Sequence, residues 1–196
     1  MGGGDKPLIE VGGRSLFSRA VAAVSDAGCA PIIAVGPTLD ERALVRWVRE
    51  DPPFAGPVAG IAAALAELGA SAPSPAPSAA PSAAPEWMLL LAGDLPRVRL
   101  VVERLIDHVN AAIRASDSCD AVVLTDGHPQ WLAGIYRTTA LRAAVDALDG
   151  DVTDASCRAL LGGLEIAWLT DDDGITADID TPADLARVRA ELEEEQ

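Results

Sequence analysis

The sequence predicts an α/β domain of three layers, in which helices cover both faces of a mostly parallel sheet. Short apolar runs alternate with stretches of helical periodicity along the chain, an order that is typical of parallel sheets. The runs APIIAVG and WMLLLAGD are apolar without alternation, as expected of strands buried on both faces. With 196 residues the chain can bury a substantial core, and we expect residues 1–196 to form one domain.

The first half of the chain carries clear helix and strand signals. Apolar side chains recur at helical spacing from Leu16 to Val24, and Gly28 follows where a C-terminal cap is expected. Asp40 precedes a second periodic stretch with Leu44 on its apolar side, which favours a helix there. The predicted elements are, in order, a helix over 15–27, a buried strand over 30–36, a helix over 38–50, and a turn followed by an Ala-rich helix that ends at Gly69.

The stretch from residue 71 to residue 86 interrupts this pattern. Before its final Glu86 it contains only Ala, Pro and Ser, whose side chains bury too little area to offset the entropy of ordering. We predict a flexible, exposed insertion within the domain, because the apolar strand that follows it would lie at the centre of the same sheet.

The second half continues the alternation of strands and helices. The final helix is predicted to start at Thr181 or Pro182, which form a cap and first-turn pair, with Asp184 in its first turn. The predicted elements are, in order, a strand over 87–94, a helix over 100–115, strands over 120–125 and 131–136, helices over 139–148 and 155–161, a strand over 165–170, and the final helix to about residue 194.

Charge and cysteine usage limit the classes of partner and compartment. Thirty acidic and fifteen basic side chains give a net charge of -15, which repels nucleic acid and anionic membranes. Cys29, Cys119 and Cys157 are widely spaced and form neither a CxxC pair nor a zinc-like cluster, so a reducing compartment suits them. No signal-peptide pattern is present, and runs such as WMLLLA are too short to span a bilayer. We therefore expect a cytoplasmic protein without nucleic-acid or membrane partners.

The opening stretch, MGGGDKPLIEVGG, is typical of a phosphate-binding loop. Gly2 and Gly3 leave backbone N–H groups unobstructed, and Lys6 supplies a cation that neutralises phosphate. Such a loop orients its amides well when a strand holds one end and a helix or packed segment holds the other. We therefore take Gly2, Gly3 and Lys6 as candidates for phosphate binding.

Asp94 is the first acidic candidate, because ligands of parallel sheets collect at the carboxyl ends of the strands. It directly follows the run MLLLAG, and Gly93 allows a backbone or a phosphate to approach closely. A carboxylate beside a triphosphate suits an octahedral Mg²⁺ ion. The alternative is a structural role, in which Asp94 caps the following helix or accepts a hydrogen bond from a turn amide.

A second acidic candidate lies in ADIDTPADL. Asp178 and Asp180 flank Ile179 and therefore point to the same side of an extended segment, where they could share a metal ion. Alternatively, Asp180 or Thr181 caps the helix that Pro182 opens. Capping by one residue is compatible with metal binding by another.

The segment GPVAG places the small residues Gly56, Pro57 and Gly60 at a turn before a helix. Exposed backbone at such a junction could receive a planar base or a ribose. Gly-Pro turns are also common without any ligand, so both interpretations stay open.

The segment GHPQWLAGIY offers His128, Gln130 and Trp131 at the start of a predicted strand. These side chains could form the wall of a site for a second substrate. The alternative is that they are loop or packing residues, since His128 has no evident catalytic partner in the sequence.

Taken in order, five segments resemble motifs of the molybdenum cofactor guanylyltransferases, which are nucleotidyltransferases with a Rossmann-like fold. MGGGDKPL resembles the end of the family's phosphate-binding loop, with Met1 at the position of the family's methionine. GPVAGIAAAL resembles a GPLAG segment, LLLAGDLP a Cys-Asp-Met-Pro segment, PQWLAGIYRTTAL a PQPL-x-ALY segment, and DIDTPADL an NxNTPEDL ending. The resemblance covers the chain except for the Ala/Pro/Ser insertion.

The resemblance implies transfer of GMP from GTP to the terminal phosphate of molybdopterin, which forms the guanine dinucleotide cofactor and pyrophosphate. It implies that Lys6 stabilises the phosphates, that Asp94 binds Mg²⁺, and that residues 56–60 face the guanine. Asp178 or Asp180 would lie near the metal or the substrate phosphate. Molybdoenzymes or other cofactor-biosynthesis proteins are the implied protein partners. Such transfers need in-line positioning and charge neutralisation rather than a side-chain nucleophile.

Two departures from the family pattern leave alternatives open. Asp178 and Asp180 stand where the family has Asn, as in molybdopterin cytidylyltransferases and phospholactate guanylyltransferases, so CTP or another phosphorylated acceptor is an alternative. The family's first strand and the LAGG-x-S-x-R half of its loop have no counterpart. Either Met1 is an internal start and the protein is longer by at least ~10 residues, given typical strand lengths, or the sheet has a central gap and the domain is a non-catalytic binding module.

Overall fold

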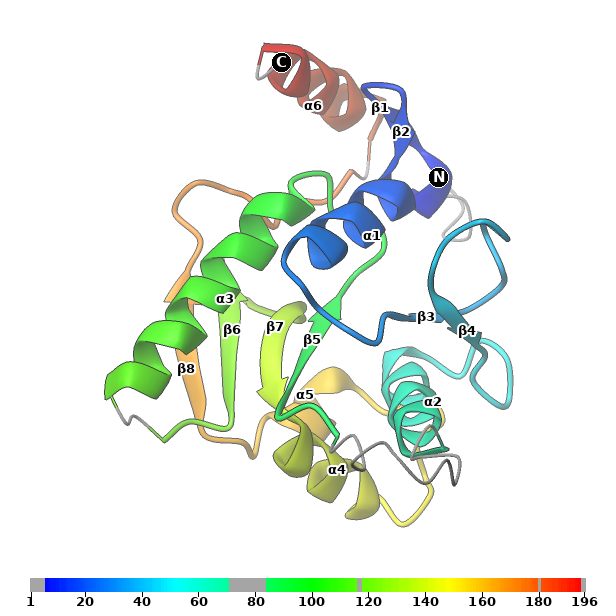
Figure 1. Cartoon of the computed structure of the whole chain (residues 1–196), viewed down its shortest axis with the longest axis vertical. Helices are drawn as coiled ribbons and strands as arrows, with labels where there is room; N and C mark the ends of the chain where they lie inside the picture. The colour runs from blue at the N-terminus through cyan, green and yellow to red at the C-terminus, as the bar shows by residue number, and fades with distance from the viewer. Residues whose placement is uncertain (1–5, 71–83, 116–117, 180, 195–196) are drawn as a thin grey trace, which may run out of the picture.

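The structure is a computed structural model that describes residues 6–70, 84–115, 118–179 and 181–194. Figure 1 shows a sheet with helices on either side of it. The sheet has four strands in the order β5-β7-β6-β8. These strands are Trp87–Leu91 (β5), Pro129–Arg137 (β7), Ala121–Thr125 (β6) and Ile166–Thr170 (β8).

The prediction of a mostly parallel sheet is wrong. β7 pairs antiparallel with both β5 and β6, whereas β6 and β8 are parallel. A turn with Gly127 at a φ of 103° joins β6 to β7, and such a tight connection allows only an antiparallel pair, because parallel neighbours need a long crossover. The sheet is therefore mixed, and the carboxyl ends of β5, β6 and β8 lie at one edge.

A separate two-stranded parallel sheet pairs β3 (Ile33–Val35) with β4 (Arg46–Val48). The prediction of a helix over 38–50 is wrong, because this stretch forms turns followed by β4, and Leu44 is 93% exposed instead of facing an apolar core. Trp47 stacks on Phe17 with ring centroids 5.1 Å apart. Pairing with β3 and this aromatic contact outweigh the helical spacing of the stretch.

The strand predicted over 30–36 is shorter and less buried than expected. β3 has three residues, and Val35 at its end is 40% exposed. β3 and the segment before it line a cavity, which explains why their apolar side chains are only partly covered.

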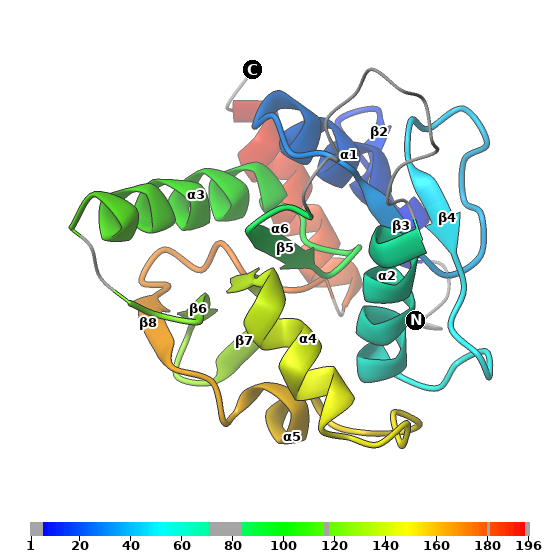
Figure 2. The ribbon, with the colours of Figure 1, turned by 60° about the horizontal axis from the view of Figure 1, so that its bottom comes forward.

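Helices form the two outer layers, as predicted. α1 (Leu16–Asp26) and α3 (Val98–Ala115) cover one face of the sheet, and α2 (Pro57–Ala70), α4 (Thr138–Asp146) and α5 (Cys157–Leu161) lie on the other (Figure 2). Each face has its own apolar core. Representative buried residues are Val101, Leu105 and Val122 on the first face, and Leu65, Tyr136 and Leu161 on the second.

The two ends of the described chain meet in a third, smaller core. Arg189 donates a hydrogen bond to the carbonyl oxygen of Glu10 at 3.1 Å. The sequence did not predict the short N-terminal hairpin. The elements here are η1 (Lys6–Leu8), β1 (Glu10–Val11), β2 (Arg14–Ser15) and α6 (Pro182–Glu194), and the buried residues between them are Val11, Leu16, Ile179 and Val188.

The remaining predicted helices and strands are confirmed, with ends that shift by a few residues. Residues 71–83 of the predicted insertion lie outside the described residues. Within the described part of the chain, every helix is too short or too polar to cross a membrane.

Candidate functional site

Lys6 and Asp94 meet at the carboxyl end of β5. Lys6 Nζ lies 3.7 Å from Asp94 Oδ2, and the two side chains are 18% and 23% exposed. β5 fixes the position of Asp94, because the Ala92 N–H donates to the Leu132 carbonyl oxygen at 2.7 Å and keeps the strand paired up to its last residues. The structure therefore brings together Lys6, the predicted phosphate ligand, and Asp94, the predicted Mg²⁺ ligand.

Asp94 does not cap the helix that follows it. α3 begins at Val98, so Asp94 lies ahead of the capping position. Gly93 lies against the N-terminal segment, since a Cβ at this glycine would lie 3.4 Å from the ring of Pro7, an ordinary van der Waals contact. The end of β5 therefore adjoins Pro7, the residue after Lys6.

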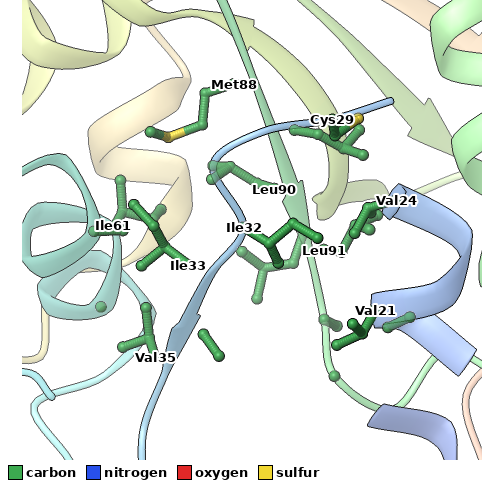
Figure 3. Close-up of a pocket in the computed structure, with 18 of the residues that line it drawn as sticks. Val21, Val24, Cys29, Ile32, Ile33, Val35, Ile61, Met88, Leu90 and Leu91 are labelled. Carbon is green, nitrogen blue, oxygen red and sulfur yellow. The ribbon is translucent and has the colours of Figure 1, made fainter. Parts of the chain in front are cut away.

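A cavity of about 720 Å³ lies beside this pair. Its walls come from β3, β5, α1 and α2, and Figure 3 shows the apolar side chains that face it. Gly56, Pro57 and Gly60 line it from the start of α2, and Gly93 lines it from the end of β5. The three residues predicted to face a base therefore share one cavity with the neighbour of Asp94.

The backbone explains why glycine occurs at the start of α2. Gly56 has a φ of 90°, which other residues rarely adopt. A Cβ at Gly60 would lie 3.3 Å from Cγ1 of Val35, so this glycine allows α2 to pack closely against β3. Both glycines thus have a structural reason in addition to the predicted contact with a ligand.

The loop between β6 and β7 is held mainly by its own hydrogen bonds. The His128 N–H donates to Asp126 Oδ1 at 3.1 Å, and Thr125 Oγ1 donates to the His128 carbonyl oxygen at 3.2 Å. A hydrogen bond from the Gln130 side chain holds the pKa of Asp126 below its usual value. Trp131 packs edge-on against Trp168 with centroids 5.7 Å apart.

This loop lies at the same edge of the sheet as Asp94. Leu91 of β5 pairs with Ala133 of β7, so the chain just before Ala133 adjoins the carboxyl end of β5. His128, Gln130 and Trp131 are therefore placed along the edge where Lys6 and Asp94 meet. The hydrogen bonds and ring contacts given for them within the described residues are with the loop, with Tyr136 of β7 and with Trp168 of β8.

The C-terminal acidic segment divides into a capping part and an exposed part. Thr181 and Asp184 form a reciprocal cap at the start of α6: the Thr181 N–H donates to Asp184 Oδ2 at 2.9 Å, and the Asp184 N–H donates to Thr181 Oγ1 at 3.1 Å. Asp178 is exposed beside the buried Ile179. The predicted capping role of Thr181 is confirmed.

Several predicted ligands lie outside the described residues. Gly2 and Gly3 of the opening loop and Asp180 of the C-terminal segment belong to this group. Among the residues that are described, no three His, Cys, Asp or Glu side chains gather in a way that could hold a metal ion. A metal at this site would therefore take Asp94 together with ligands from the substrate or from other parts of the chain.

One protein family and several solved structures are similar to this chain. A family model described as the MobA-like NTP transferase domain matches residues 1–167. The comparison with curated proteins gives no match. Molybdopterin-guanine dinucleotide biosynthesis protein A from Archaeoglobus fulgidus is 19% identical, with a TM-score of 0.60 over 98% of this chain and 92% of that chain.

Two further solved structures are similar to the same extent. The 2-C-methyl-D-erythritol 4-phosphate cytidylyltransferase from Thermus thermophilus is 20% identical, with a TM-score of 0.64 over 97% of this chain and 95% of that chain. A nucleotidyl transferase from Methanothermobacter is 20% identical, with a TM-score of 0.61 over 97% and 86%. These likenesses establish the α/β nucleotidyltransferase fold, and because the family model covers most of the sequence, the chain belongs to the MobA-like NTP transferase domain family.

Proposed function

We propose that this protein is a cytoplasmic, Mg²⁺-dependent guanylyltransferase of molybdenum cofactor biosynthesis. A terminal phosphate oxygen of molybdopterin would attack the α-phosphorus of GTP, the bond to the β-phosphate would break, and pyrophosphate would leave. The observation that carries this proposal is the Lys6–Asp94 pair at the carboxyl end of β5, beside the cavity that Gly56, Pro57 and Gly60 line. Family membership supports nucleotidyl transfer, and the five ordered motifs favour these substrates.

Lys6 suits the role of phosphate ligand. Its ammonium group is a compact charge that can neutralise the negative charge gathering on the leaving pyrophosphate. With most of its side chain covered and its charge 3.7 Å from Asp94, Lys6 is restrained before any nucleotide binds. Such preorganisation makes electrostatic stabilisation effective.

Asp94 fits Mg²⁺ because its partly exposed carboxylate projects from the end of a strand. Mg²⁺ keeps several water ligands and commonly binds one or two carboxylates together with substrate phosphates. The ion would supply neutralisation of phosphate charge during transfer. Asp94 would hold the ion, and Lys6 would balance the charge of Asp94 before the ion binds. Asp178, a candidate from the DIDTPADL motif, would be a further metal ligand.

The remaining predicted residues would bind the guanine base and the acceptor. Gly56, Pro57 and Gly60 would present backbone to guanine, and His128, Gln130 and Trp131 would line the acceptor side. The first three line the cavity that Gly93 also lines, and the last three lie along the edge of the sheet that holds the carboxyl end of β5. This supports the division, since nucleotide and acceptor must meet near Asp94. Molybdoenzymes that receive the finished cofactor are the proposed protein partners.

The test is an assay of pyrophosphate release with molybdopterin, Mg²⁺ and either GTP or CTP, for the wild type and for Asp94→Asn. We expect turnover with GTP in the wild type and a loss of at least about 100-fold in the variant, comparable to removal of one key electrostatic group. Asp107→Asn is the matched control, because Asp107 is an exposed residue of α3 away from β5. Faster turnover with CTP would assign a cytidylyltransferase, and no turnover with either nucleotide would favour a binding module.

A further inference from the structure

Trp168 is a large aromatic side chain that stays exposed on the sheet. It lies in the middle of β8, the end strand of the four-stranded sheet (Figure 1), and it is 47% exposed. Its partner in β6 is Val123, which is fully buried on the face that α4 and α5 cover. End strands that face water usually carry charged residues or Pro, so an open tryptophan here indicates a binding surface.

Trp168 forms an aromatic pair with Trp131 of β7. The ring centroids lie 5.7 Å apart, and the ring planes are inclined by 68°. In such an edge-on contact one ring meets the other with its edge, so ring surface is left for a further planar group. The backbone of Trp131 is held in place, because the buried hydroxyl of Tyr136 donates to the Trp131 carbonyl oxygen at 2.8 Å. This tryptophan pair is therefore ordered before any ligand binds.

The tryptophan pair lies on the proposed acceptor side. Trp131 is near the start of β7 and adjoins the carboxyl end of β5, because Leu91 of β5 pairs with Ala133 of β7. β6 and β8 lie beyond β7 in the sheet. With neighbouring strands about 4.8 Å apart, a ring bound between β7 and β8 is about 5–15 Å from β5 across the sheet. An acceptor whose ring and terminal phosphate are at opposite ends can span such a distance.

Polar groups lie in the loop directly before Trp131. Asp126 is exposed and accepts a hydrogen bond from the His128 N–H at 3.1 Å. A hydrogen bond from the Gln130 side chain holds the pKa of Asp126 below its usual value, so the carboxylate is charged near neutral pH. A carboxylate has more acceptor sites than these bonds use. Together with the apolar rings, this loop offers the mixture of apolar and polar groups that small-molecule sites use.

We propose that Trp168, together with Trp131, stacks on the pterin ring of the acceptor. This inference rests on the proposed function and assigns a binding role to Trp168, which the sequence did not single out. Aromatic side chains stack well on planar heterocycles. The amino group and ring N–H of the pterin would donate to Asp126, and the terminal phosphate would point toward Asp94.

The kinetic test measures kcat and the KM values for molybdopterin and GTP in the wild type, Trp168→Ala and Trp168→Phe. Loss of stacking removes binding of the ground state and the transition state alike, so we expect the KM for molybdopterin to rise at least about fivefold in Trp168→Ala. The kcat and the KM for GTP should stay unchanged. Trp168→Phe should restore most of the affinity, since Phe keeps a ring face.

Ile113→Ala is the matched control. Ile113 is 50% exposed, as Trp168 nearly is, but it lies in α3, which covers the other face of the sheet. Its removal deletes a similarly exposed apolar side chain and should leave the KM for molybdopterin at the wild-type value.

Tryptophan fluorescence tests stacking without turnover. 6-Hydroxymethylpterin, the probe, should quench the emission of the wild type and of Ile113→Ala saturably, after correction with free N-acetyltryptophanamide. Trp168→Ala should lose the saturable part. Excess GTP, whose base has a similar donor edge, should not displace the probe, because the nucleotide binds on the other side of Asp94.

The outcomes separate this inference from the proposed function. A wild-type KM for molybdopterin in an active Trp168→Ala enzyme would overturn the inference alone. No turnover by the wild type would overturn the proposed function, and absence of saturable quenching would then reject pterin stacking as well. Displacement of the probe by GTP would assign the tryptophan pair to the nucleotide. Dimers in size-exclusion chromatography that Trp168→Ala dissociates would assign Trp168 to a second copy and overturn the inference.

Discussion

Asp171, which directly follows β8, has a buried carboxylate that is held by hydrogen bonds from the following loop and lies near an arginine. It accepts hydrogen bonds from the N–H groups of Ile175 and Thr176 at 2.9 and 2.8 Å and from Thr176 Oγ1 at 2.6 Å. Arg104 lies 3.8 Å away. Burial acts to raise the pKa of Asp171, but the hydrogen bonds and the Arg104 charge outweigh it and hold the pKa below its usual value.

Replacing Asp171→Asn should lower the free energy of unfolding by roughly 2 kcal/mol near neutral pH, because hydrogen bonds to a charged group are worth about 1.5–3 kcal/mol. The native pKa is lowered, so this contribution is present above the unfolded pKa of about 4 and is lost as the pH falls through the native pKa. Urea unfolding of both proteins at neutral pH and in acid measures the difference.

The neighbouring exposed residue provides the control for this prediction. Asp172→Asn removes the same charge from a solvent-exposed position and should change the free energy of unfolding by no more than about 0.5 kcal/mol. If Asp171→Asn matches the wild type near neutral pH, or if its deficit persists unchanged in acid, the carboxylate does not stabilise this loop.

The sequence could predict Lys6 as a phosphate ligand from the glycines before it, and Asp94 as a ligand from its place after an apolar strand, but their contact is seen only in the structure. It could not predict that Trp131 would contact Trp168, since this contact depends on the position of β8 beside β6. For Asp94 the sequence left a capping role open, and only the position of α3 excludes it. Local patterns thus identify chemistry-bearing residues, and long-range pairing decides what they touch.

At the scale of elements, long periodic segments were predictable and the short stretch before α2 was not. α1 has a strong apolar face, a Ser15 cap, and Gly28 with a φ of 75° just past its end. The stretch over 38–50 has similar spacing, but β4 forms within it because β3 offers a parallel partner. The direction of β7 was missed for a related reason, because an apolar run does not reveal which way a strand runs.

β7 also contains a glycine, Gly134, at a position where the ring of Tyr136 leaves no room for a larger residue. A Cβ at Gly134 would lie 2.9 Å from Cε2 and 3.0 Å from the hydroxyl of Tyr136. This ring is fully buried, and its hydroxyl donates to the Trp131 carbonyl oxygen at 2.8 Å. Gly134→Ala should therefore lower the free energy of unfolding by about 1–3 kcal/mol, as overpacked cores do, in a urea titration.

Gly163→Ala is the matched substitution, because a Cβ at Gly163 would have no neighbour within 4 Å. It should leave the free energy of unfolding within about 0.5 kcal/mol of the wild type. Combining Gly134→Ala with Tyr136→Leu should cost less than the sum of the two single changes, since the crowded ring is then absent. Simple additivity would show that the Tyr136 ring is not the obstacle.

At the scale of the whole molecule, the net charge of -15 distinguishes this chain from a neutral domain of equal size. Self-repulsion of that charge destabilises the compact state, and added salt screens it. Raising NaCl from about 10 mM to about 150 mM shortens the screening length from roughly 30 Å to roughly 8 Å. We expect the melting temperature near neutral pH to rise by a few degrees, since about 1 kcal/mol corresponds to ~2–4 °C in a chain of this length.

Repeating this change of salt concentration near pH 5 separates charge screening from a general effect of salt on apolar surface. The sequence pI is about 4.3, so the net negative charge is much smaller there and salt should shift the melting temperature less. Differential scanning calorimetry at both pH values gives the comparison. An equal rise at both pH values would attribute the effect to salting-out of apolar surface, including the cavity between β3 and β5, and would leave the self-repulsion of the acidic surface without a measurable role in stability.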